Sequence, residues 1–443
     1  MSGYENYTLS PVPWIKQMPG HWGLVRGKNL YQKMQRPTSD TDEVVTCFRD
    51  GTVTLRKNRR TTGFTESLKE IGYQGIRKGD LVIHVMDAFA GSIGVSDSDG
   101  KGTPVYSVCQ AKGNSNNQYY ALLLREMARS GYIQSLYRGI RERSSDFRFE
   151  VFAAQFYPVP PREEQDQIVR FLDWKVSGIN KLIAVKQKQI ATLKEFMQAE
   201  IEKQLCAYPV VSVVRLKQLG TFFKGGGFSR DNLVEDEEYP AILYGDIYTQ
   251  YEYKTSIITH HIDGTAYSAS RKILKGDIVM AGTGETKDEI GKSILYMGDQ
   301  IVAAGGDVIV FHPNGGINVE YLLYQLYSQA ALKHRYINGK GDIIVHIYPT
   351  ALGNTIITLP GEADQNKVVA IINEIIDQVK KAIAVLTDEI SVLREYRVRL
   401  VADTVTGKID VRGIEIPEYE FVDEDTDTGN EDGSEEETEE QED

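Results

Sequence analysis

The sequence is poor in cysteine and contains no long apolar run. Three cysteines in 443 residues, Cys47, Cys109 and Cys206, are too few and too widely spaced for a disulfide scaffold or a zinc site. No apolar stretch approaches the length of about eighteen residues that a membrane-spanning helix needs. Residues 1–14 also lack a basic stretch followed by an apolar run, so no secretory signal is visible. We therefore expect a soluble, cytoplasmic protein with no membrane association.

Recognisable catalytic motifs are missing as well. Residues 284–293 end like a phosphate-binding loop, but Thr286 stands where that loop requires a glycine. His260 and His261 are adjacent and would point in different directions, and no Cys or His cluster accompanies them to form a metal site. The nucleophile elbow Gly-x-Ser-x-Gly does not occur. Nothing in the sequence identifies an enzyme, a metal site or a cofactor site.

Basic residues are absent from the last part of the chain. Residues 415–443 contain sixteen Asp and Glu and no Lys or Arg, so residues 1–414 carry +3 although the whole chain carries −13. Residues 1–155 carry +6 and residues 206–355 carry −3. A polyanionic partner would favour the first of these segments. Dense like charge with few apolar groups predicts that residues 415–443 are disordered.

The most informative feature that is present is an internal repeat. The stretch from Pro160 onward matches the stretch from Pro360 onward without gaps, and the segments before them match at an offset of 197. This second match pairs residues 78–82 with 275–279, and Ile93-Gly94 with Ile290-Gly291. An ungapped match of this length predicts two copies of one structural unit. The identities at the offset of 200 are Pro160/Pro360, Gln165/Gln365, Val169/Val369, Lys181/Lys381, Ile183/Ile383, Ala184/Ala384, Val185/Val385, Ile190/Ile390, Leu193/Leu393 and Glu195/Glu395.

Both copies of this match predict long helices that pair with each other. Apolar residues step by four and three over about four heptads, which keeps one seam against a partner helix as in a coiled coil. Two unrelated amphipathic helices in separate domains are the alternative, but the shared offset favours mutual packing. The pair is expected to be antiparallel, because the bodies follow one another along one chain. The expected seam residues are Leu172, Ile179, Ile183, Ile190 and Leu193 in the first copy and Ile372, Val379, Ile383, Ile390 and Leu393 in the second.

The segments before the helices predict mixed α and β structure. Short alternating runs bounded by Gly, Asn and Asp indicate strands, and helical patches follow near residues 119–129 and 319–332. The expected fold class is α+β: two globular bodies alternating with two long helices that pair as an antiparallel coiled coil in a pseudo-twofold repeat. The expected segments are a first body at 1–155, a first long helix at 156–205, a second body at 206–355, a second long helix at 356–414 and an acidic tail at 415–443.

Several side chains are candidates for contact with nucleic acid. Arg56, Lys57, Arg59 and Arg60 follow a strand-like run, and Arg suits bidentate contacts with guanine whereas Lys suits phosphate. A glycine-rich loop in the second body would let its backbone approach a phosphate closely. A solvated surface loop is the alternative for every candidate. The second-body candidates are Gly226, Arg230, Tyr244, Tyr248, Arg271 and Lys272.

Three strings resemble the specificity subunits of type I restriction–modification systems. Residues 160–165 (Pro-Pro-Arg-Glu-Glu-Gln) resemble that family's entry into its first helix, and residues 405–412 (Val-Thr-Gly-Lys-Ile-Asp-Val-Arg) resemble the end of its second helix. Trp14-Ile15 with residues 19–22 resembles its N-terminal opening. The resemblance covers residues 1–412. The second helix departs from the pattern, because residues 359–365 lack the double proline and the Glu-Gln pair, and the acidic tail lies outside the pattern.

The resemblance implies a non-catalytic reader of double-stranded DNA. Each body would be a target-recognition domain for one half of a bipartite target, and the paired helices would dock two methyltransferase subunits, which restriction subunits join. S-adenosylmethionine, ATP and Mg would be bound by those partners, with no cofactor and no metal on this chain. A specificity subunit of a related non-type-I methylation system, a non-enzymatic sequence-specific DNA-binding regulator and a structural coiled-coil adaptor stay open as alternatives.

Overall fold

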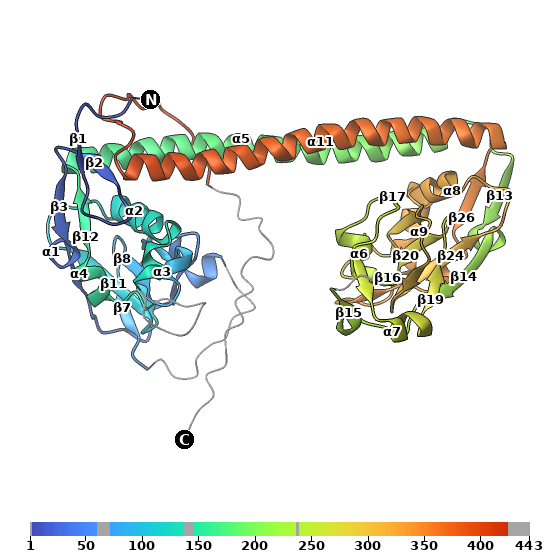
Figure 1. The fold of residues 1–443 in the computed structure, drawn as a ribbon, viewed down its shortest axis with the longest axis horizontal. Coiled ribbons are helices and arrows are strands. Elements are labelled where there is room, and N and C mark those ends of the chain that lie inside the picture. Colours follow the sequence, from blue (N-terminus) through green and yellow to red (C-terminus); the bar gives the residue numbers. More distant parts are fainter. Residues whose placement is uncertain (1, 60–70, 137–145, 236–238, 424–443) are drawn as a thin grey trace, which may run out of the picture. The chain divides into compact units, whose positions relative to one another are not determined.

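The computed structural model describes residues 2–59, 71–136, 146–235 and 239–423 (Figure 1). Contacts divide the chain into two units. Unit 1 consists of Met1–Lys186 and Asp388–Asp443, and unit 2 consists of Gln187–Thr387. Two long helices, α5 (Arg162–Leu205) and α11 (Glu362–Val405), each contribute one half to unit 1 and the other half to unit 2. Each unit is therefore one mixed α and β body with part of both helices.

The first body is built on a four-stranded antiparallel sheet in the order β4-β11-β8-β9. Its β8 strand has the apolar run Leu81-Val82-Ile83, and all three side chains are fully buried, as expected for a strand covered on both faces. One cover is the cluster that joins Val82 to Val45 and Val53 of a neighbouring hairpin. The helix α2 contacts β8 and β9. The bounds of the sheet elements are β4 Tyr31–Lys33, β11 Tyr106–Ala111, β8 Leu81–His84, β9 Ile93–Val95 and α2 Asn117–Arg129.

Smaller strand pairs and short helices complete this body. Four pairs are antiparallel two-stranded sheets: β1 with β2, β3 with β12, β5 with β6, and β7 with β10. Their bounds are β1 Tyr7–Leu9, β2 Gln17–Pro19, β3 Gly23–Arg26, β12 Phe156–Val159, β5 Val45–Cys47, β6 Val53–Leu55, β7 Gln74–Ile76 and β10 Gly100–Gly102. The short helices are α1 Gly27–Leu30, η1 Arg56–Asn58, η2 Ala88–Ala90, α3 Tyr132–Ser135 and α4 Phe149–Ala154.

The second body has three layers around a five-stranded sheet in the order β14-β24-β20-β22-β17. The side chains of β20 alternate between two cores, as the period of two in a strand requires. Ile278 and Met280 pack with helix α8 and the long helices, whereas Val279 and Ala281 pack with a second sheet in the order β15-β18-β16-β23-β19. The bounds of the first sheet are β14 Gly220–Lys224, β24 Val308–Pro313, β20 Ile278–Ala281, β22 Ser293–Tyr296 and β17 Lys254–Thr255.

The remaining elements of the second body surround these two sheets. The second sheet consists of β15 Leu233–Val234, β18 His260–Ile262, β16 Tyr239–Ile242, β23 Val302–Ala304 and β19 Arg271–Ile273. Two antiparallel pairs are β13 Ser212–Arg215 with β26 Ile356–Leu359, and β21 Thr283–Gly284 with β25 Val345–His346. The helices are η3 Leu216–Gln218, η4 Arg230–Asn232, α6 Tyr244–Thr249, α7 Gly264–Ala269, α8 Val319–Gln325, α9 Gln329–Asn338 and α10 Pro349–Leu352.

The two bodies share one plan, although their registers differ from the sequence match. The order β4-β11-β8-β9 corresponds to β14-β24-β20-β22, and β3-β12 corresponds to β13-β26. The match of Ile93-Gly94 with Ile290-Gly291 is wrong as a structural equivalence. Ile93 lies opposite Ile83 in the first sheet, whereas Ser293 lies opposite the corresponding Met280 in the second. The connection from β20 to β22 is three residues longer, so a constant offset misaligns the strand that follows it.

The long helices pair antiparallel. Within unit 1, Lys186 Nζ lies 2.5 Å from Glu389 Oε2, and Arg397 donates to Asn180 Oδ1 at 2.8 Å, so later residues of α11 meet earlier residues of α5. Within unit 2, Ile201 of α5 shares a core with Ile372 of α11. All ten expected seam residues are buried or half-buried. The fold class expected from the 4-3 stepping and the repeat is confirmed.

Candidate nucleic-acid interface

Each body is attached to the first turn of a long helix by one buried glutamine. Gln165 of α5 accepts a hydrogen bond from the Asn116 N–H at 2.8 Å and donates to the Pro160 carbonyl at 2.9 Å. Gln365 of α11 accepts from the Asn318 N–H at 3.3 Å and donates to the Pro360 carbonyl at 3.0 Å. Asn116 and Asn318 are the N-caps of α2 and α8. The attachment is therefore repeated, and the sequence departure at residues 359–364 leaves it intact.

The first body has a second attachment that the other body lacks. Glu164, only 4% exposed, accepts hydrogen bonds from Tyr4 Oη at 2.6 Å and Trp22 Nε1 at 2.9 Å, and its other oxygen lies 2.7 Å from His21 Nε2. Burial is the main cause that raises the pKa of the Tyr4 hydroxyl, and the neighbouring Glu164 carboxylate raises it further. Asp364 at the repeat-equivalent position pairs with Lys367 of its own helix. Glu164 thus fixes the N-terminal segment to α5.

The repeated Lys-Gly-Asp string forms the turn before the central strand of each body. Asp80 accepts the Arg77 N–H at 2.8 Å and pairs with Arg36. Asp277 accepts the Leu274 N–H at 2.8 Å and lies 2.5 Å from His312 Nδ1. Burial raises the pKa of Asp277, and its two partners oppose the rise. These carboxylates position β8 and β20, so the string carries a structural role.

The basic turn of the first body is engaged in contacts of its own. Arg56 Nε donates to Thr46 Oγ1 at 3.3 Å, and Lys57 Nζ pairs with Glu43 at 2.6 Å. Arg59 pairs with Asp50 and stacks over the Phe48 ring, 4.5 Å from its centroid. Arg60 lies outside the described residues. The Lys57–Glu43 pair is exposed, and exposed pairs contribute little, so Lys57 stays available to a phosphate. Arg59 is partly covered by Asp50 and Phe48.

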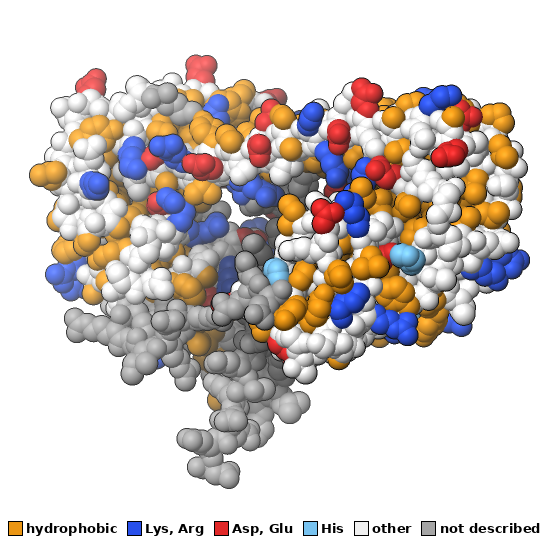
Figure 2. Space-filling model, turned by 45° about the vertical axis from the view of Figure 1, so that its right-hand side comes forward, with side chains coloured by type: hydrophobic (Ala, Val, Ile, Leu, Met, Phe, Trp, Pro, Cys, Tyr) orange, Lys and Arg blue, Asp and Glu red, His pale blue; other side chains and the backbone are white. Residues whose placement is uncertain are grey.

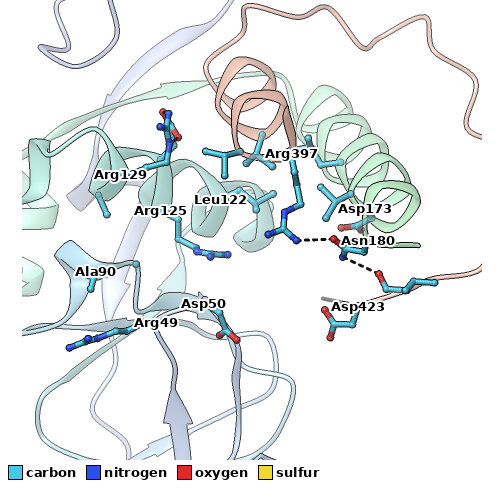
Figure 3. A pocket seen from close by; sticks show the side chains of 18 of the residues that line it. Arg49, Asp50, Ala90, Leu122, Arg125, Arg129, Asp173, Asn180, Arg397 and Asp423 are labelled. Carbon is cyan, nitrogen blue, oxygen red and sulfur yellow. Dashed lines mark hydrogen bonds and ion pairs between the residues drawn. The ribbon is translucent and has the colours of Figure 1, made fainter. Parts of the chain in front are cut away.

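A cavity of about 450 Å³ lies beside this turn within unit 1. Figure 3 shows Arg49, Arg125 and Arg129 on one side and Asp423 on another, with Asp50 between them. Asp50 is the residue that pairs with Arg59, so the cavity adjoins the basic turn. Sequence reasoning missed these arginines. The spacing of four between Arg125 and Arg129 on a helical pattern was the available signal.

Four candidates of the second body fall into two neighbouring pairs. The Arg230 guanidinium lies beside Gly245, next to Tyr244, which is 39% exposed. The Arg230 side chain makes no hydrogen bond or ion pair with any described residue, whereas its backbone carbonyl accepts the Leu233 N–H. Gly226 has φ +155° and open space where a Cβ would stand, and the next glycine packs on Ser270, the residue before Arg271. Arg230 therefore lies beside Tyr244, and the glycine loop lies beside the residue that precedes Arg271.

The other two candidates point into the body. Lys272 Nζ donates to the carbonyls of Tyr267 and Ser270, and desolvation lowers the pKa of Lys272. Tyr248 is half-buried and donates to the Glu289 carbonyl at 3.3 Å. Both side chains serve the packing of this body. The visible face of the second body carries apolar side chains with Lys and Arg among them (Figure 2).

In the part of the chain that the structure describes, no group of three or more His, Cys, Asp or Glu is arranged to hold a metal ion. No described helix is long and apolar enough to cross a membrane.

Comparison with known proteins identifies the domain and the fold. A model of the type I restriction modification DNA specificity domain matches residues 210–390. A solved chain from work on complex assembly and conformational transition of the type I R-M system has a TM-score of 0.65 at 16% identity, over 88% of this chain and 99% of that one. No curated protein matches the sequence.

Two further solved structures are similar over most of their length. The HsdS subunit of Thermoanaerobacter tengcongensis has a TM-score of 0.46 at 16% identity, over 88% of this chain and 98% of that one. The S subunit of M. genitalium has a TM-score of 0.33 at 14% identity, over 93% of this chain and 100% of that one. Residues 210–390 thus match the type I restriction modification DNA specificity domain, and the chain has the fold of a solved chain from the type I R-M system.

Proposed function

We propose that this chain is the DNA-reading subunit of a type I restriction–modification complex, that it has no catalytic activity of its own, and that each body reads one half of a bipartite target. The duplication carries this proposal. Two bodies with one strand order are attached through Gln165 and Gln365 to the first turns of two antiparallel helices. A pseudo-twofold pair of unlike readers suits a target made of two unlike half-sites.

Affinity and sequence selection would come from different contacts. Phosphate contacts fix the register on the duplex, and base-edge contacts in the grooves select the sequence. In the first body, Lys57 and Arg59 of the basic turn suit the former role. In the second body, the unpaired guanidinium of Arg230 suits a bidentate base contact. Each correctly read base pair would contribute roughly 1–3 kcal/mol of discrimination.

The long helices would dock two methyltransferase subunits. Exposed apolar side chains stand at repeat-equivalent positions, with Val185 and Val385 50% and 58% exposed, and Phe196 and Tyr396 51% and 46% exposed. Apolar groups left uncovered in the same way on both copies favour two copies of one partner. Restriction subunits would join this cytoplasmic complex, and S-adenosylmethionine, ATP and Mg would be bound by the partners.

Two other functions share part of this support. A specificity subunit of a related non-type-I methylation system would use the same architecture with different partners. A non-enzymatic DNA-binding regulator would need no partner on the helices, and the repeated exposed positions speak against it. The match at residues 210–390 favours the type I system over both.

Co-expression with a type I methyltransferase subunit from the same genome tests the proposal. We expect a complex that methylates one bipartite motif, read out by long-read methylome sequencing. The double variant Val185→Glu with Val385→Glu should no longer bind the methyltransferase but should still bind DNA. The control, Lys188→Ala with Asp388→Ala at exposed polar positions, should still bind the methyltransferase. Retained DNA binding with no methyltransferase bound to the unaltered chain would favour the regulator.

A further inference from the structure

The described chain ends in a strap, residues 411–423, that lies along the first half of α5. Ser177 Oγ donates to the Glu420 carbonyl at 3.0 Å and accepts the Val422 N–H at 2.7 Å. Asn180 Nδ2 donates to the Val422 carbonyl at 3.2 Å. Ser177 and Asn180 are 2% and 7% exposed, so the strap backbone supplies the partners that these buried polar groups need.

Gln167 holds the start of the same strap. Its Nε2 donates to the carbonyls of Val411 at 3.1 Å and Ile414 at 2.7 Å. The segment expected to be disordered therefore begins with residues 415–423 bound to a helix, because polar side chains of α5 pair with its backbone. Residues 424–443 lie outside the described residues.

The surface that binds the strap is not repeated on α11. The positions that follow Ser177 and Asn180 by 200 residues are Asp377 and Lys380, and both are exposed. The two helices are identical at nine other positions, including Lys181 with Lys381. The two helices therefore differ at the positions by which α5 binds the C-terminal segment. This difference restricts that segment to unit 1.

The strap ends at the cavity of unit 1, whose lining includes four arginines and four acidic residues, Asp423 among them. Phe421, Val422 and Asp423 line this cavity, and Arg49 and Arg129 line it from the first body (Figure 3). Arg49 is paired with Asp87 at 3.1 Å and Arg129 with Glu126 at 2.6 Å, but their side chains are 40% and 53% exposed. The Arg49–Asp87 pair is exposed and therefore weak, and the Arg129 side chain keeps half of its surface exposed beside its own partner, so both can contact a second anion.

The residues that follow the strap supply such anions. Twelve of the twenty residues 424–443 are Asp or Glu, and none is Lys or Arg. We propose that residues 424–443 dock on the basic surface of the first body around this cavity and compete there with DNA. The proposal rests on the proposed function, since it assigns the first body a DNA partner, and it adds that binding by the second body escapes this competition.

Effective concentration and electrostatic screening both favour competition by an attached acidic segment at low salt. A segment attached directly to the bound strap has an effective concentration of roughly millimolar at the neighbouring surface. Attraction between opposite charges is screened beyond about 10 Å at 0.1 M salt. Because the interaction is electrostatic and the tail has few apolar groups to bury, competition should be strong at low salt and fade as salt rises.

Three forms of the full chain test the proposal on one probe, a fluorescent random-sequence DNA duplex. They are the unaltered chain, a chain ending at Asp423, which keeps the strap, and a chain with every Asp and Glu of residues 424–443 changed to Asn or Gln. The second and third should bind about tenfold more tightly than the first near 50 mM salt, and the difference should shrink at higher salt.

The location of the competition is tested by charge removal in each body. In the background Arg49→Ala with Arg129→Ala, deleting residues 424–443 should change DNA affinity much less. In the matched background Arg230→Ala with Arg271→Ala, the deletion should keep its full effect. Equal affinities of the three forms at all salt concentrations, or the same deletion effect in both backgrounds, would overturn the inference while sequence-specific binding still supported the proposed function. Absence of DNA binding by every form would overturn both.

Discussion

Glu164 receives its partners from residues more than 140 positions earlier in the chain. Tyr4, His21 and Trp22 all reach this one buried carboxylate at the start of α5. The string Pro-Pro-Arg-Glu-Glu-Gln is recognisable in the sequence, but its purpose is not, because the partners lie in a segment with no regular pattern. The structure explains why this position carries Glu whereas the second copy carries Asp364.

Replacing this carboxylate should destabilise unit 1 selectively. Glu164→Ala leaves two donors and one imidazole without a partner, and breaking a buried charged contact costs roughly 3–5 kcal/mol of unfolding free energy. Urea unfolding followed by Trp22 fluorescence in a variant without the other tryptophans measures the loss. Asp364→Ala is the control, because it removes only an exposed pair with Lys367 and should change little. Equal effects of the two substitutions would contradict the role assigned to Glu164.

Single substitutions test whether the basic turn of the first body contacts DNA. Lys57→Ala and Arg59→Ala should each weaken binding of all duplex sequences and reduce the salt slope by about one if they contact phosphate. Arg56→Ala should relax one position of the target instead if Arg56 contacts a base. Salt titrations of duplex binding, together with methylome sequencing, distinguish these contacts. Unchanged affinity and an unchanged motif in all three variants would remove the turn from the interface.

At the scale of elements, sequence patterns predicted what local periodicity controls. The 4-3 stepping from Leu172 to Leu193 predicted a helix, and α5 runs from Arg162 to Leu205. The pattern could not place side chains whose partners come from elsewhere. Lys272 and Tyr248 point inward because carbonyls of Tyr267 and Glu289 happen to lie within reach. The contact of the strap with Ser177 could not be predicted from the sequence either, because its partners come from a distant part of the chain.

Two glutamines offer a test of the repeated attachment. Gln165→Leu and Gln365→Leu keep the side-chain volume but leave a buried N–H and a buried carbonyl unpaired, at about 1–3 kcal/mol for each unsatisfied group. We expect the two variants to lose similar amounts of stability, one in each unit. Hydrogen exchange of the Asn116 and Asn318 amides should rise only in the unit that carries the substitution. A loss confined to one variant would show that the attachments are not equivalent.

The whole molecule combines a repeated frame with two bodies of unlike charge. The central sheets share one order, the attachments share one geometry, and the surfaces differ in charge, at +6 for residues 1–155 and −3 for residues 206–355. Net charge alone, at −13, misrepresents such a chain, because residues 424–443 hold most of the excess. The charge of each segment, and not the total, therefore bears on a polyanionic partner.

Under the proposed function, the pseudo-twofold repeat predicts what happens when the two bodies are made identical. Residues 23–159 begin and end on the paired strands β3 and β12, and residues 212–359 begin and end on the equivalent pair β13 and β26. Replacing the first range with the second keeps the N-terminal residues that contact Glu164 and places Asn318 where Asn116 meets Gln165. Two copies of one reader related by a twofold axis recognise inverted copies of one half-site. The methylated motif should become palindromic, built from one half of the original, while the reverse replacement should give the palindrome of the other half. An assembled, active complex that still methylates the original asymmetric motif, or an asymmetric motif of any kind, would show that the two bodies do not read independently.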